Sequence, residues 1–302
     1  MELGLVMLGT GAGLPTPERG LPSIALVYKG SIVLLDAGEG TQRAMSKAGL
    51  SPLKVEAVFI THLHGDHFFG LPGLLQSMAM LGRRKELLVV GPRGLKSFVE
   101  AAAEATGWLP PYPVEIVELR GGGVVKTLSG LEVEAFPVAH TVEAYGYKVV
   151  EPPRRPKVNL EAARRLGIKP GPLLGRLQRG EAVIVGGRVV KPEDVLEPQP
   201  RAVIVYTGDT APAERIIEAA RGAHVLVHDS TFSSAMAEEA YKQGHSTAAD
   251  AGEAASRAGA RSLVLFHVSA RYRDARVLED EARRFHPHVV VAEDMQKVVV
   301  RL

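Results

Sequence analysis

The 302-residue sequence contains no cysteine. That absence excludes disulfide bonds, thiolate metal sites and a cysteine nucleophile, and it leaves the redox compartment undetermined. An excess of one charge is also missing, since 36 Lys and Arg residues stand against 34 Asp and Glu residues, for a net charge of +2. The chain as a whole is therefore not a polybasic nucleic-acid binder, and any such surface must be a local patch.

Long apolar runs are absent as well, and none is long enough to cross a bilayer. The opening stretch, Met1–Leu8, lacks the basic lead of a signal peptide and runs directly into a Gly-rich turn. We therefore expect a cytoplasmic protein without a membrane partner. At 46% hydrophobic residues, the chain is able to bury a sizeable core in one large domain or two small ones.

What the sequence does contain is a rhythm of short apolar strands, tight turns and helices, which indicates an α/β protein. Many of the strands run into a His or an Asp, and α/β scaffolds collect sites on one rim by placing polar residues where strands end. Strands are predicted at residues 3–8, 23–28, 31–35, 55–60, 87–90, 131–137, 202–206, 225–228, 262–266 and 297–302. Helices are predicted at residues 41–49, where Thr41 is expected to cap, and at 70–81 and 94–106.

The densest polar cluster follows the predicted strand at residues 55–60, where His62, His64, Asp66 and His67 lie within six positions. Imidazole nitrogens and carboxylate oxygens suit zinc and its neighbours among the transition metals. A surface loop that happens to be rich in histidine is the simpler alternative. The narrow spacing, together with later residues that complete the set, favours a metal site.

Two metal ions about 3.5 Å apart need a bridging carboxylate and enough ligands to share. His62 and His64 are spaced to reach one ion together, while Asp66 and His67 continue the turn toward a second. Asp209 is the natural bridge. A lone histidine at a strand end is usually a capping or core residue, but seven candidates at strand ends favour ligation. The predicted ligand set is His62, His64, Asp66, His67, His140, Asp209 and His267.

Asp36 also follows an apolar strand, at residues 31–35. It could be a turn residue or a helix N-cap. We favour a supporting role, in which its carboxylate accepts the other ring N–H of His62 and orients that imidazole.

The segment from residue 150 to residue 200 stands apart, because its apolar periodicity weakens while Pro, Gly and Arg accumulate. A solvated linker with ordinary surface charge is one interpretation. A long excursion inside a compact domain is more often functional or disordered, and clustered Lys and Arg against a near-neutral background form an electrostatic footprint. We therefore expect one domain over residues 1–302, with a projecting basic arm at 150–200 that grips a polyanion.

Taken together, these motifs resemble the metallo-β-lactamase superfamily and, within it, the ribonuclease Z family of tRNA 3′-processing endoribonucleases. The wider resemblance rests on His62-x-His64-x-Asp66-His67 with Asp36, His140, Asp209 and His267. The narrower resemblance rests on His67–Leu75, His228–Phe232 against the family's His-Glu-Ala-Thr motif, His245-Ser246-Thr247, His267–Tyr272, and a Gly-Pro exosite at Lys169–Pro172. Two departures are visible: Asp229 replaces the family's usual Glu, and the loop Pro15–Gly20 keeps Arg19 but has Pro17 and Gly20 where Lys and Asn are common.

The resemblance implies a four-layer αββα sandwich of the α/β class, two zinc ions per chain with manganese, iron or cobalt as alternatives, and a homodimer. It implies cleavage of precursor tRNA after the discriminator nucleotide, leaving a tRNA 3′-hydroxyl and a 5′-phosphorylated trailer. Asp66 would hold the proton of the attacking water, and His245, steadied by Asp229, would protonate the leaving oxygen. The implied RNA contacts are Arg19, Arg154, Arg155, Lys157, Lys169, Gly171, Pro172, Arg176 and Arg271.

Simpler readings stay open for several of these features. His245 could be only a residue before a helix, and Arg271 could pair with an acidic neighbour instead of a phosphate. A general phosphodiesterase on the same scaffold would need the metals but no basic arm. A non-catalytic RNA-binding protein with a structural metal is a third reading, although open His/Asp sites are of the catalytic type.

Overall fold

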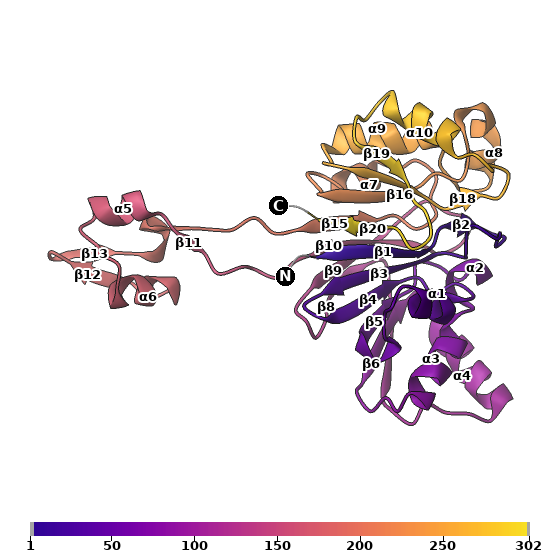
Figure 1. The fold of residues 1–302 in the computed structure, drawn as a ribbon, viewed down its shortest axis with the longest axis horizontal. Coiled ribbons are helices and arrows are strands. Elements are labelled where there is room, and N and C mark those ends of the chain that lie inside the picture. The colour runs from indigo at the N-terminus through magenta and orange to yellow at the C-terminus, as the bar shows by residue number, and fades with distance from the viewer. Residues whose placement is uncertain (1–2, 301–302) are drawn as a thin grey trace. The chain divides into compact units, whose positions relative to one another are not determined.

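The computed structural model describes residues 3–300, which form two compact units (Figure 1). The first unit comprises residues 3–151 and 202–300, and the second comprises residues 152–201. None of the helices within residues 3–300 combines the length and the apolar content needed to cross a membrane.

The first unit is built on two mixed sheets of seven described strands each. In the first sheet the order is β20-β1-β3-β4-β5-β6-β7, with β1 Gly4–Gly9, β3 Ser23–Tyr28, β4 Ser31–Leu35, β5 Val55–Phe59, β6 Leu87–Gly91, β7 Val114–Glu118 and β20 Lys297–Val299. In the second the order is β19-β17-β16-β15-β10-β9-β8, with β8 Gly123–Lys126, β9 Glu132–Pro137, β10 Tyr145–Val150, β15 Val203–Tyr206, β16 Val225–Asp229, β17 Leu263–Phe266 and β19 Val289–Val291. A short parallel pair, β2 Gly11–Ala12 and β18 Val268–Ser269, lies outside both sheets.

Helices cover the outer face of each sheet (Figure 1). The first sheet is covered by α1 Thr41–Lys47, α2 Gly65–Phe68, α3 Leu71–Met80 and α4 Leu95–Thr106, and the second by α7 Glu214–Ala219, α9 Ala248–Ala258 and α10 Arg276–Arg283. Helix α8 Ala237–Lys242 and the 3-10 turns Pro52–Lys54 and Ser234–Met236 complete the unit. The predicted αββα four-layer sandwich is therefore confirmed.

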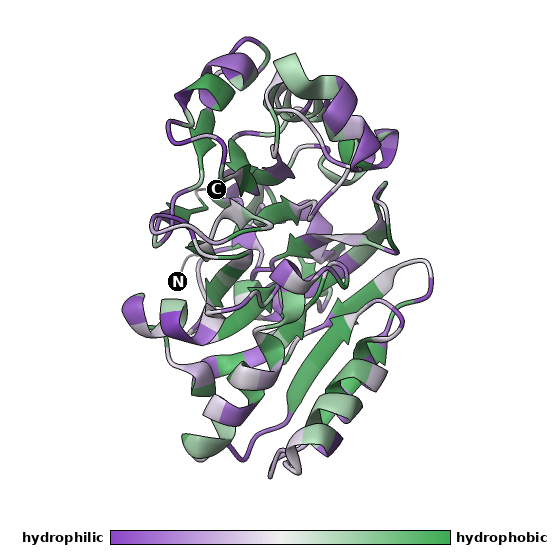
Figure 2. Cartoon of the chain, turned by 90° about the vertical axis from the view of Figure 1, so that its right-hand side faces the viewer, coloured by the Kyte–Doolittle hydropathy of each residue, from purple (hydrophilic) through white to green (hydrophobic). Residues whose placement is uncertain are grey.

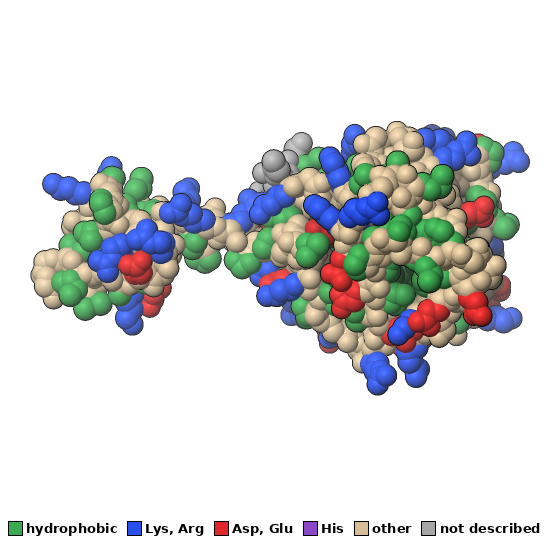
Figure 3. Space-filling view, turned by 90° about the horizontal axis from the view of Figure 1, so that it is seen from below, with side chains coloured by type: hydrophobic (Ala, Val, Ile, Leu, Met, Phe, Trp, Pro, Cys, Tyr) green, Lys and Arg blue, Asp and Glu red, His purple; other side chains and the backbone are tan. Residues whose placement is uncertain are grey.

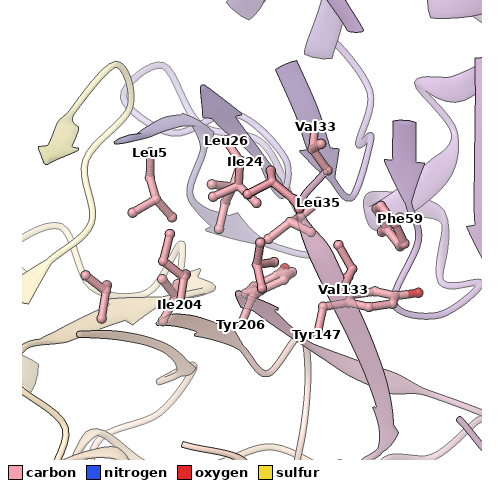
Figure 4. Close-up of a cluster of buried hydrophobic side chains, with 14 of the residues drawn as sticks. Leu5, Ile24, Leu26, Val33, Leu35, Phe59, Val133, Tyr147, Ile204 and Tyr206 are labelled. Atoms are coloured by element: carbon pink, nitrogen blue, oxygen red, sulfur yellow. The ribbon is translucent and has the colours of Figure 1, made fainter. Parts of the chain in front are cut away.

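The strands read as continuous apolar runs because both of their faces are buried. Alternate residues of β1 point to opposite sides: Leu5 and Met7 lie between the two sheets, whereas Val6 and Leu8 face the helices. Side chains from both sheets meet in the central core (Figure 4). Figure 2 shows the hydrophobic strands inside and the hydrophilic residues on the outer turns of the helices.

Strand direction explains where polar residues collect. Strands β4 to β7 are mutually parallel in the first sheet, and β15, β16, β17 and β19 are mutually parallel in the second. The carboxyl ends of these strands therefore lie on one rim of each sheet. The rims are joined by hydrogen bonds, since Tyr145 N–H donates to Thr61 O at 2.9 Å and Tyr147 OH donates to Ile60 O at 2.6 Å.

The predicted elements differ from the observed ones mainly at their ends. Gly40, with φ 85°, precedes α1, and Thr41 is its first residue, whose hydroxyl donates back to Gly38 O at 2.7 Å. The left-handed backbone at this turn favours glycine at the position that we expected Thr41 to fill. The strand predicted at residues 297–302 is observed as β20, Lys297–Val299. Residues 301–302 of that prediction lie outside the described residues.

The second unit has a small apolar core of its own, whereas we expected a segment without a core pattern. It contains β11 Lys157–Val158 paired with β14 Leu196–Glu197, β12 Val183–Val185 paired with β13 Arg188–Val190, helices α5 Leu160–Arg165 and α6 Pro172–Gln178, and the turn Pro192–Asp194. Its buried residues are Ala163, Ile168, Leu174, Leu177, Val183, Val190 and Val195. Each short element contributes only one or two of them, so no long period is visible in the sequence. Lys and Arg side chains lie on the visible face of this unit (Figure 3).

Candidate metal centre and active site

All seven predicted ligands lie in the first unit and meet at the rim where the strands end. His62 and His64 lie on the loop after β5, Asp66 and His67 in the short helix α2, His140 after β9, Asp209 after β15, and His267 after β17. Their ligating atoms form groups in which every atom lies within 4.8 Å of the others. The clustering follows from the fold, because the carboxyl ends of neighbouring strands deliver each residue to the same place.

One group combines three imidazoles with Asp209. His64 Nδ1 lies 3.1 Å from His62 Nε2 and 3.1 Å from His140 Nε2, and His62 Nε2 lies 3.7 Å from Asp209 Oδ2. Ligand atoms about 2.05 Å from a tetrahedral zinc ion lie about 3.3 Å from one another. The spacing of these four atoms therefore fits a single cation of that size.

A second group surrounds the other side of Asp209. His67 Nε2 lies 3.3 Å from His267 Nε2 and 3.7 Å from Asp66 Oδ2, and His267 Nε2 lies 3.4 Å from Asp66 Oδ2. Asp209 reaches this group as well, with Oδ1 3.3 Å from His67 Nε2 and Oδ2 3.3 Å from His267 Nε2. Asp209 is thus the carboxylate common to both groups.

The protonation states of the buried groups fit a cation site. Asp209 Oδ1 is buried and accepts no well-aligned hydrogen bond, although His67 Nε2 lies 3.3 Å away, and a buried carboxylate oxygen in this position favours a cation as its partner. Burial alone would raise the pKa of Asp209, but His267 and His67 outweigh it and lower the pKa well below its usual value. Burial lowers the pKa of His62, His64 and His140. These three rings are therefore neutral, which is the form that binds metal ions.

His67 faces two buried carboxylates. Burial alone would lower its pKa, but Asp209 and Asp36 outweigh burial and raise the pKa well above its ordinary value. His67 Nδ1 donates to Asp36 Oδ2 at 2.7 Å, and its Nε2 is the atom turned toward the second group. The two carboxylates of Asp209 and Asp36 therefore favour a positive charge at the centre of the site, carried either by this ring or by a bound cation.

Asp36 supports a different ligand from the one that we predicted. Its carboxylate is fully buried and accepts hydrogen bonds from His67 Nδ1 at 2.7 Å, Thr61 N–H at 2.7 Å and Tyr206 OH at 2.8 Å. His62, the partner expected from the sequence, instead has Nδ1 2.9 Å from the Thr61 hydroxyl, which in turn donates to Asp36 at 3.0 Å. The prediction of a direct contact between Asp36 and His62 was wrong.

The physical reason lies in the turn that carries the motif. Ala37 N–H donates to His67 O at 2.8 Å, which folds helix α2 back over the end of β4. Asp36 has φ 58° there, so its side chain turns toward His67. Asp36 reaches His62 only through the hydroxyl of Thr61, a residue whose role no sequence pattern indicated.

Two further predicted ligands are held by groups that the sequence did not indicate. His267 Nδ1 donates to the Thr231 hydroxyl at 2.7 Å, and that hydroxyl donates to Asp229 Oδ1 at 2.7 Å. His140 Nδ1 donates to Gly244 O at 2.7 Å. Such contacts fix the orientation of a ligating imidazole. A backbone carbonyl leaves no mark in a sequence, and Thr231 was visible only as part of a motif.

The contact of Thr231 with His267 yields a first prediction. Thr231→Val keeps the shape of the side chain but removes the hydroxyl that orients His267, so zinc affinity is expected to fall by about 10- to 100-fold. Titration with zinc against a competing chelator would measure this change. Thr127→Val is the matched control, because Thr127 is another buried threonine and belongs to none of the ligand groups. Equal zinc affinity in the Thr231 variant and the wild type would show that this hydrogen bond does not support the ligand.

His245 and Asp229 form a pair beside the second group. His245 Nδ1 donates to Asp229 Oδ2 at 2.8 Å, and Asp229 is held in turn by Thr210 N–H at 2.9 Å and Thr231 N–H at 2.9 Å. Burial alone would lower the pKa of His245, but the Asp229 carboxylate outweighs burial and raises it to about 9. The ring stacks on His267 with centroids 5.2 Å apart. The pair therefore presents a protonated imidazole at the edge of the ligand cluster.

The predicted RNA contacts fall into two sets, of which Arg19 and Arg271 belong to the first unit. Arg19 Nη1 donates to Ala292 O at 2.5 Å and to the Thr10 hydroxyl at 2.6 Å, so this guanidinium joins the loop to the end of the chain. Arg271 lies 4.6 Å over the ring of Phe232, and no carboxylate within residues 3–300 lies within ion-pair distance of it. Arg19 likewise has no ion pair among the described residues, but the nearby carboxylates of Asp294 and Glu293 oppose the lowering of its pKa by burial.

In the second unit the predicted basic contacts are exposed, and some of them have local partners. Arg176 Nε donates to Glu181 at 2.8 Å, and Arg155 donates to Gln178 at 2.6 Å. Pro172 is the first residue of α6, and Gly171 precedes it. The remaining predicted contacts in this unit, all exposed, are Arg154, Lys157 and Lys169.

Comparison with known proteins shows similarity over nearly the whole chain. The family model described as Anti-Pycsar protein Apyc1 matches residues 3–101, and the one described as Beta-lactamase superfamily domain matches residues 194–268. Ribonuclease Z of Ignicoccus hospitalis is 50% identical over 295 residues, covering 98% of this chain and 97% of that protein. Ribonuclease Z of Methanosarcina acetivorans is 40% identical over 301 residues, covering 99% and 98%. The crystal structure of the short form of human tRNase Z is 25% identical with a TM-score of 0.71, covering 99% of this chain and all of that one.

Proposed function

We propose that this chain, which belongs to the ribonuclease Z family, is a metal-dependent endoribonuclease that cleaves 3′-extended precursor tRNA after the discriminator nucleotide. The products would be a tRNA with a 3′-hydroxyl and a trailer with a 5′-phosphate. The observation that carries this proposal is the pair of ligand groups that share Asp209, with the His245–Asp229 pair beside them. Near full-length similarity to ribonuclease Z of other organisms supports the substrate.

We propose two zinc ions per chain, with manganese, iron or cobalt as alternatives, because the donors are nitrogen and oxygen without sulfur. His62, His64, His140 and Asp209 would hold one, and Asp66, His67 and His267 the other, with Asp209 as their fourth ligand because it lies 3.3 Å from both His67 Nε2 and His267 Nε2. Such a pair supplies an activated water and neutralises charge on the phosphate.

The chain's own residues then handle the protons. Asp66 Oδ2 accepts a hydrogen bond from Gly13 N–H at 2.9 Å, and burial of Asp66 is outweighed by His267, which keeps its pKa below the usual value. The Asp66 carboxylate is therefore an anion positioned to orient the proton of the attacking water. His245 keeps Nδ1 bonded to Asp229, so its Nε2 proton is the one available to the leaving 3′ oxygen.

The direct test is incubation of the purified chain with a 3′-extended precursor tRNA and mapping of both product ends. Cleavage after the discriminator nucleotide, with the end groups stated above, supports the proposal. Cleavage elsewhere, or no cleavage with both metals loaded, contradicts it.

A general phosphodiesterase acting on small or other RNA substrates is the second candidate, since it needs only the metal centre. Residues 152–201 form a separate compact unit, and Glu151 N–H donates to Ala202 O at 2.9 Å where the chain leaves and re-enters the first unit. The segment is thus removable with a short linker. Loss of precursor-tRNA cleavage with retained hydrolysis of a small phosphodiester supports tRNA processing, whereas equal loss of both in a folded protein favours the second candidate.

We propose that the second unit binds the tRNA backbone, and this yields a second prediction. Changing Arg154, Arg155, Lys157, Lys169 and Arg176 to alanine is expected to weaken precursor-tRNA binding and to flatten its salt dependence. In a plot of the logarithm of the binding constant against the logarithm of salt concentration, each lost phosphate contact reduces the magnitude of the slope by roughly 0.7–0.9. Filter binding at several salt concentrations measures both effects, while hydrolysis of a small phosphodiester should scarcely change.

The matched control for that variant removes exposed positive charge elsewhere. Lys54, Arg84 and Lys85 are exposed residues of the first unit, and their alanine variant should keep the wild-type slope. If the second-unit variant also binds with unaltered affinity and slope, its basic residues are only solvated surface.

We further propose a cytoplasmic homodimer in which the second unit of one subunit serves the site of its partner, as the family resemblance implies. Light scattering of the full chain measures the oligomeric state. Mixing a chain that lacks residues 152–201 with a chain inactive at Asp209 would restore cleavage only if the two subunits share these parts.

A further inference from the structure

An exposed aromatic ring lies directly beside the metal ligands. Phe69 follows helix α2, and its N–H donates to Gly65 O at 3.0 Å. It is 59% exposed, whereas the next most exposed aromatic side chains among the described residues are Tyr241 at 47% and Phe285 at 46%. Tyr241 has a polar partner in Asp250, but a phenyl ring has no polar atom to satisfy. Exposure of this kind leaves apolar area in water, and a stacked base would cover it.

The Phe69 ring is held in place by its neighbours. It stacks on Phe98 with centroids 6.0 Å apart and an interplanar angle of 16°, and it lies 4.9 Å from Phe68. Phe68 is 4% exposed and belongs to the core, and the partly buried Phe98 packs on it at 4.6 Å. Phe69 therefore adds an outer ring to a fixed aromatic stack while keeping most of its own surface in solvent.

The position of the ring follows from Gly65. A Cβ atom at Gly65 would lie only 2.4 Å from Phe69 Cε2, so the phenyl ring lies across the backbone of Gly65. Gly65 separates His64, a ligand of the first group, from Asp66, a ligand of the second. The exposed ring is thus carried by the same turn that holds the predicted ligands His64 and Asp66.

We propose that Phe69 is the stacking platform for a base that flanks the scissile phosphate. This inference rests on the proposed function, because it takes the substrate to be RNA. Single-stranded nucleotides are recognised by stacking of unpaired bases on aromatic rings, and such stacking tolerates any base. A rigid phenyl face beside the ligands would hold the cleaved strand in register with little loss of side-chain freedom and without a sequence requirement.

The test compares Phe69→Ala and Phe69→Trp on precursor tRNA and on a small phosphodiester without a base. We expect kcat/KM of Phe69→Ala on precursor tRNA to fall by roughly 10- to 100-fold, the usual effect of losing one base–aromatic stack. Phe69→Trp keeps a π face and should restore cleavage. Hydrolysis of the small phosphodiester should stay close to that of the wild type for both variants.

Leu128→Ala is the matched control, because Leu128 is also an apolar side chain and is 77% exposed. It lies at the opposite rim of the sheet, since the N–H of the next residue, Ser129, donates to Glu56 near the start of β5. This variant should leave both activities unchanged. Precursor tRNAs with a single abasic nucleotide on either side of the cleavage site then locate the base. At one position the abasic substrate should be cleaved equally by the wild type and Phe69→Ala.

Three results would overturn the inference, and the first two are undiminished cleavage of precursor tRNA by Phe69→Ala and a loss that persists with every abasic substrate. A parallel loss on the small phosphodiester would also overturn it, because the metal turn itself would then be disturbed. Failure of the wild type to cleave precursor tRNA would instead contradict the proposed function, so the two failures are distinguishable.

Discussion

Replacing Asp209 with alanine is expected to abolish cleavage of precursor tRNA and to lower the metal content of the protein. Asp209 Oδ2 lies 3.7 Å from His62 Nε2 in one ligand group and 3.3 Å from His267 Nε2 in the other. The variant loses the only described carboxylate that reaches both groups, and two cations held close together need such a shared anion. Both sites should weaken together, and cleavage should fall to background.

Metal analysis of the purified variant, alongside cleavage assays, measures this result. Glu281→Gln is the matched control, because Glu281 is another buried carboxylate and accepts a hydrogen bond from Ser234 N–H at 2.7 Å, away from the ligands. The assignment of Asp209 as the bridge would be defeated by two ions per chain in the alanine variant, as in the wild type.

His245→Ala is expected to keep both metal ions and to lower turnover by roughly 10²- to 10⁴-fold, the usual contribution of a positioned proton donor. His245 forms a further group with Asp209, Asp229 and His267, whose ligating atoms lie within 4.8 Å of one another. Its Nδ1 is committed to Asp229 at 2.8 Å and lies 4.0 Å from Asp209 Oδ2, so we assign this ring to proton donation and not to metal binding. Its pKa of about 9 keeps it protonated at neutral pH, as a proton donor requires.

The leaving group separates this role from a structural one. A nitrophenolate is stable as an anion, so it leaves a phosphodiester without taking up a proton. His245→Ala should therefore hydrolyse a nitrophenyl phosphodiester nearly as well as the wild type does. A ribose 3′ oxygen needs the proton, and there the full loss should appear. If the variant instead loses metal, His245 is a ligand and the division of the histidines between the two roles is wrong.

Much of the layered fold was predictable because its strands are buried on both faces. The runs at residues 57–60 and 263–266 are fully apolar, and a histidine follows each of them within two residues, so both the strand and the delivery of a ligand to the rim could be derived from spacing alone. The gathering of seven ligands follows from the same rule, since carboxyl ends of parallel strands share an edge.

What the sequence could not supply were contacts made by turns. The pairing of Asp36 with His67 depends on the left-handed backbone conformation of Asp36 and on the way α2 folds back over β4. Neither feature produces a periodic pattern in the sequence. The supporting hydroxyls of Thr61 and Thr231 are common residues whose partners lie on other elements. The core of the second unit was missed because its apolar residues are scattered over several short elements.

The ligand groups have a mechanical consequence for the sandwich. His62, His64, Asp66 and His67 come from the first sheet and its loops, whereas His140, Asp209 and His267 come from the second. Each group therefore takes donors from both sheets, and any cation bound there is a cross-link between them. Because a cation that binds only the closed arrangement stabilises it by mass action, loading of the centre and closure of the sandwich are thermodynamically linked. Residues selected for phosphodiester chemistry would then also set how firmly the two halves of the unit hold together.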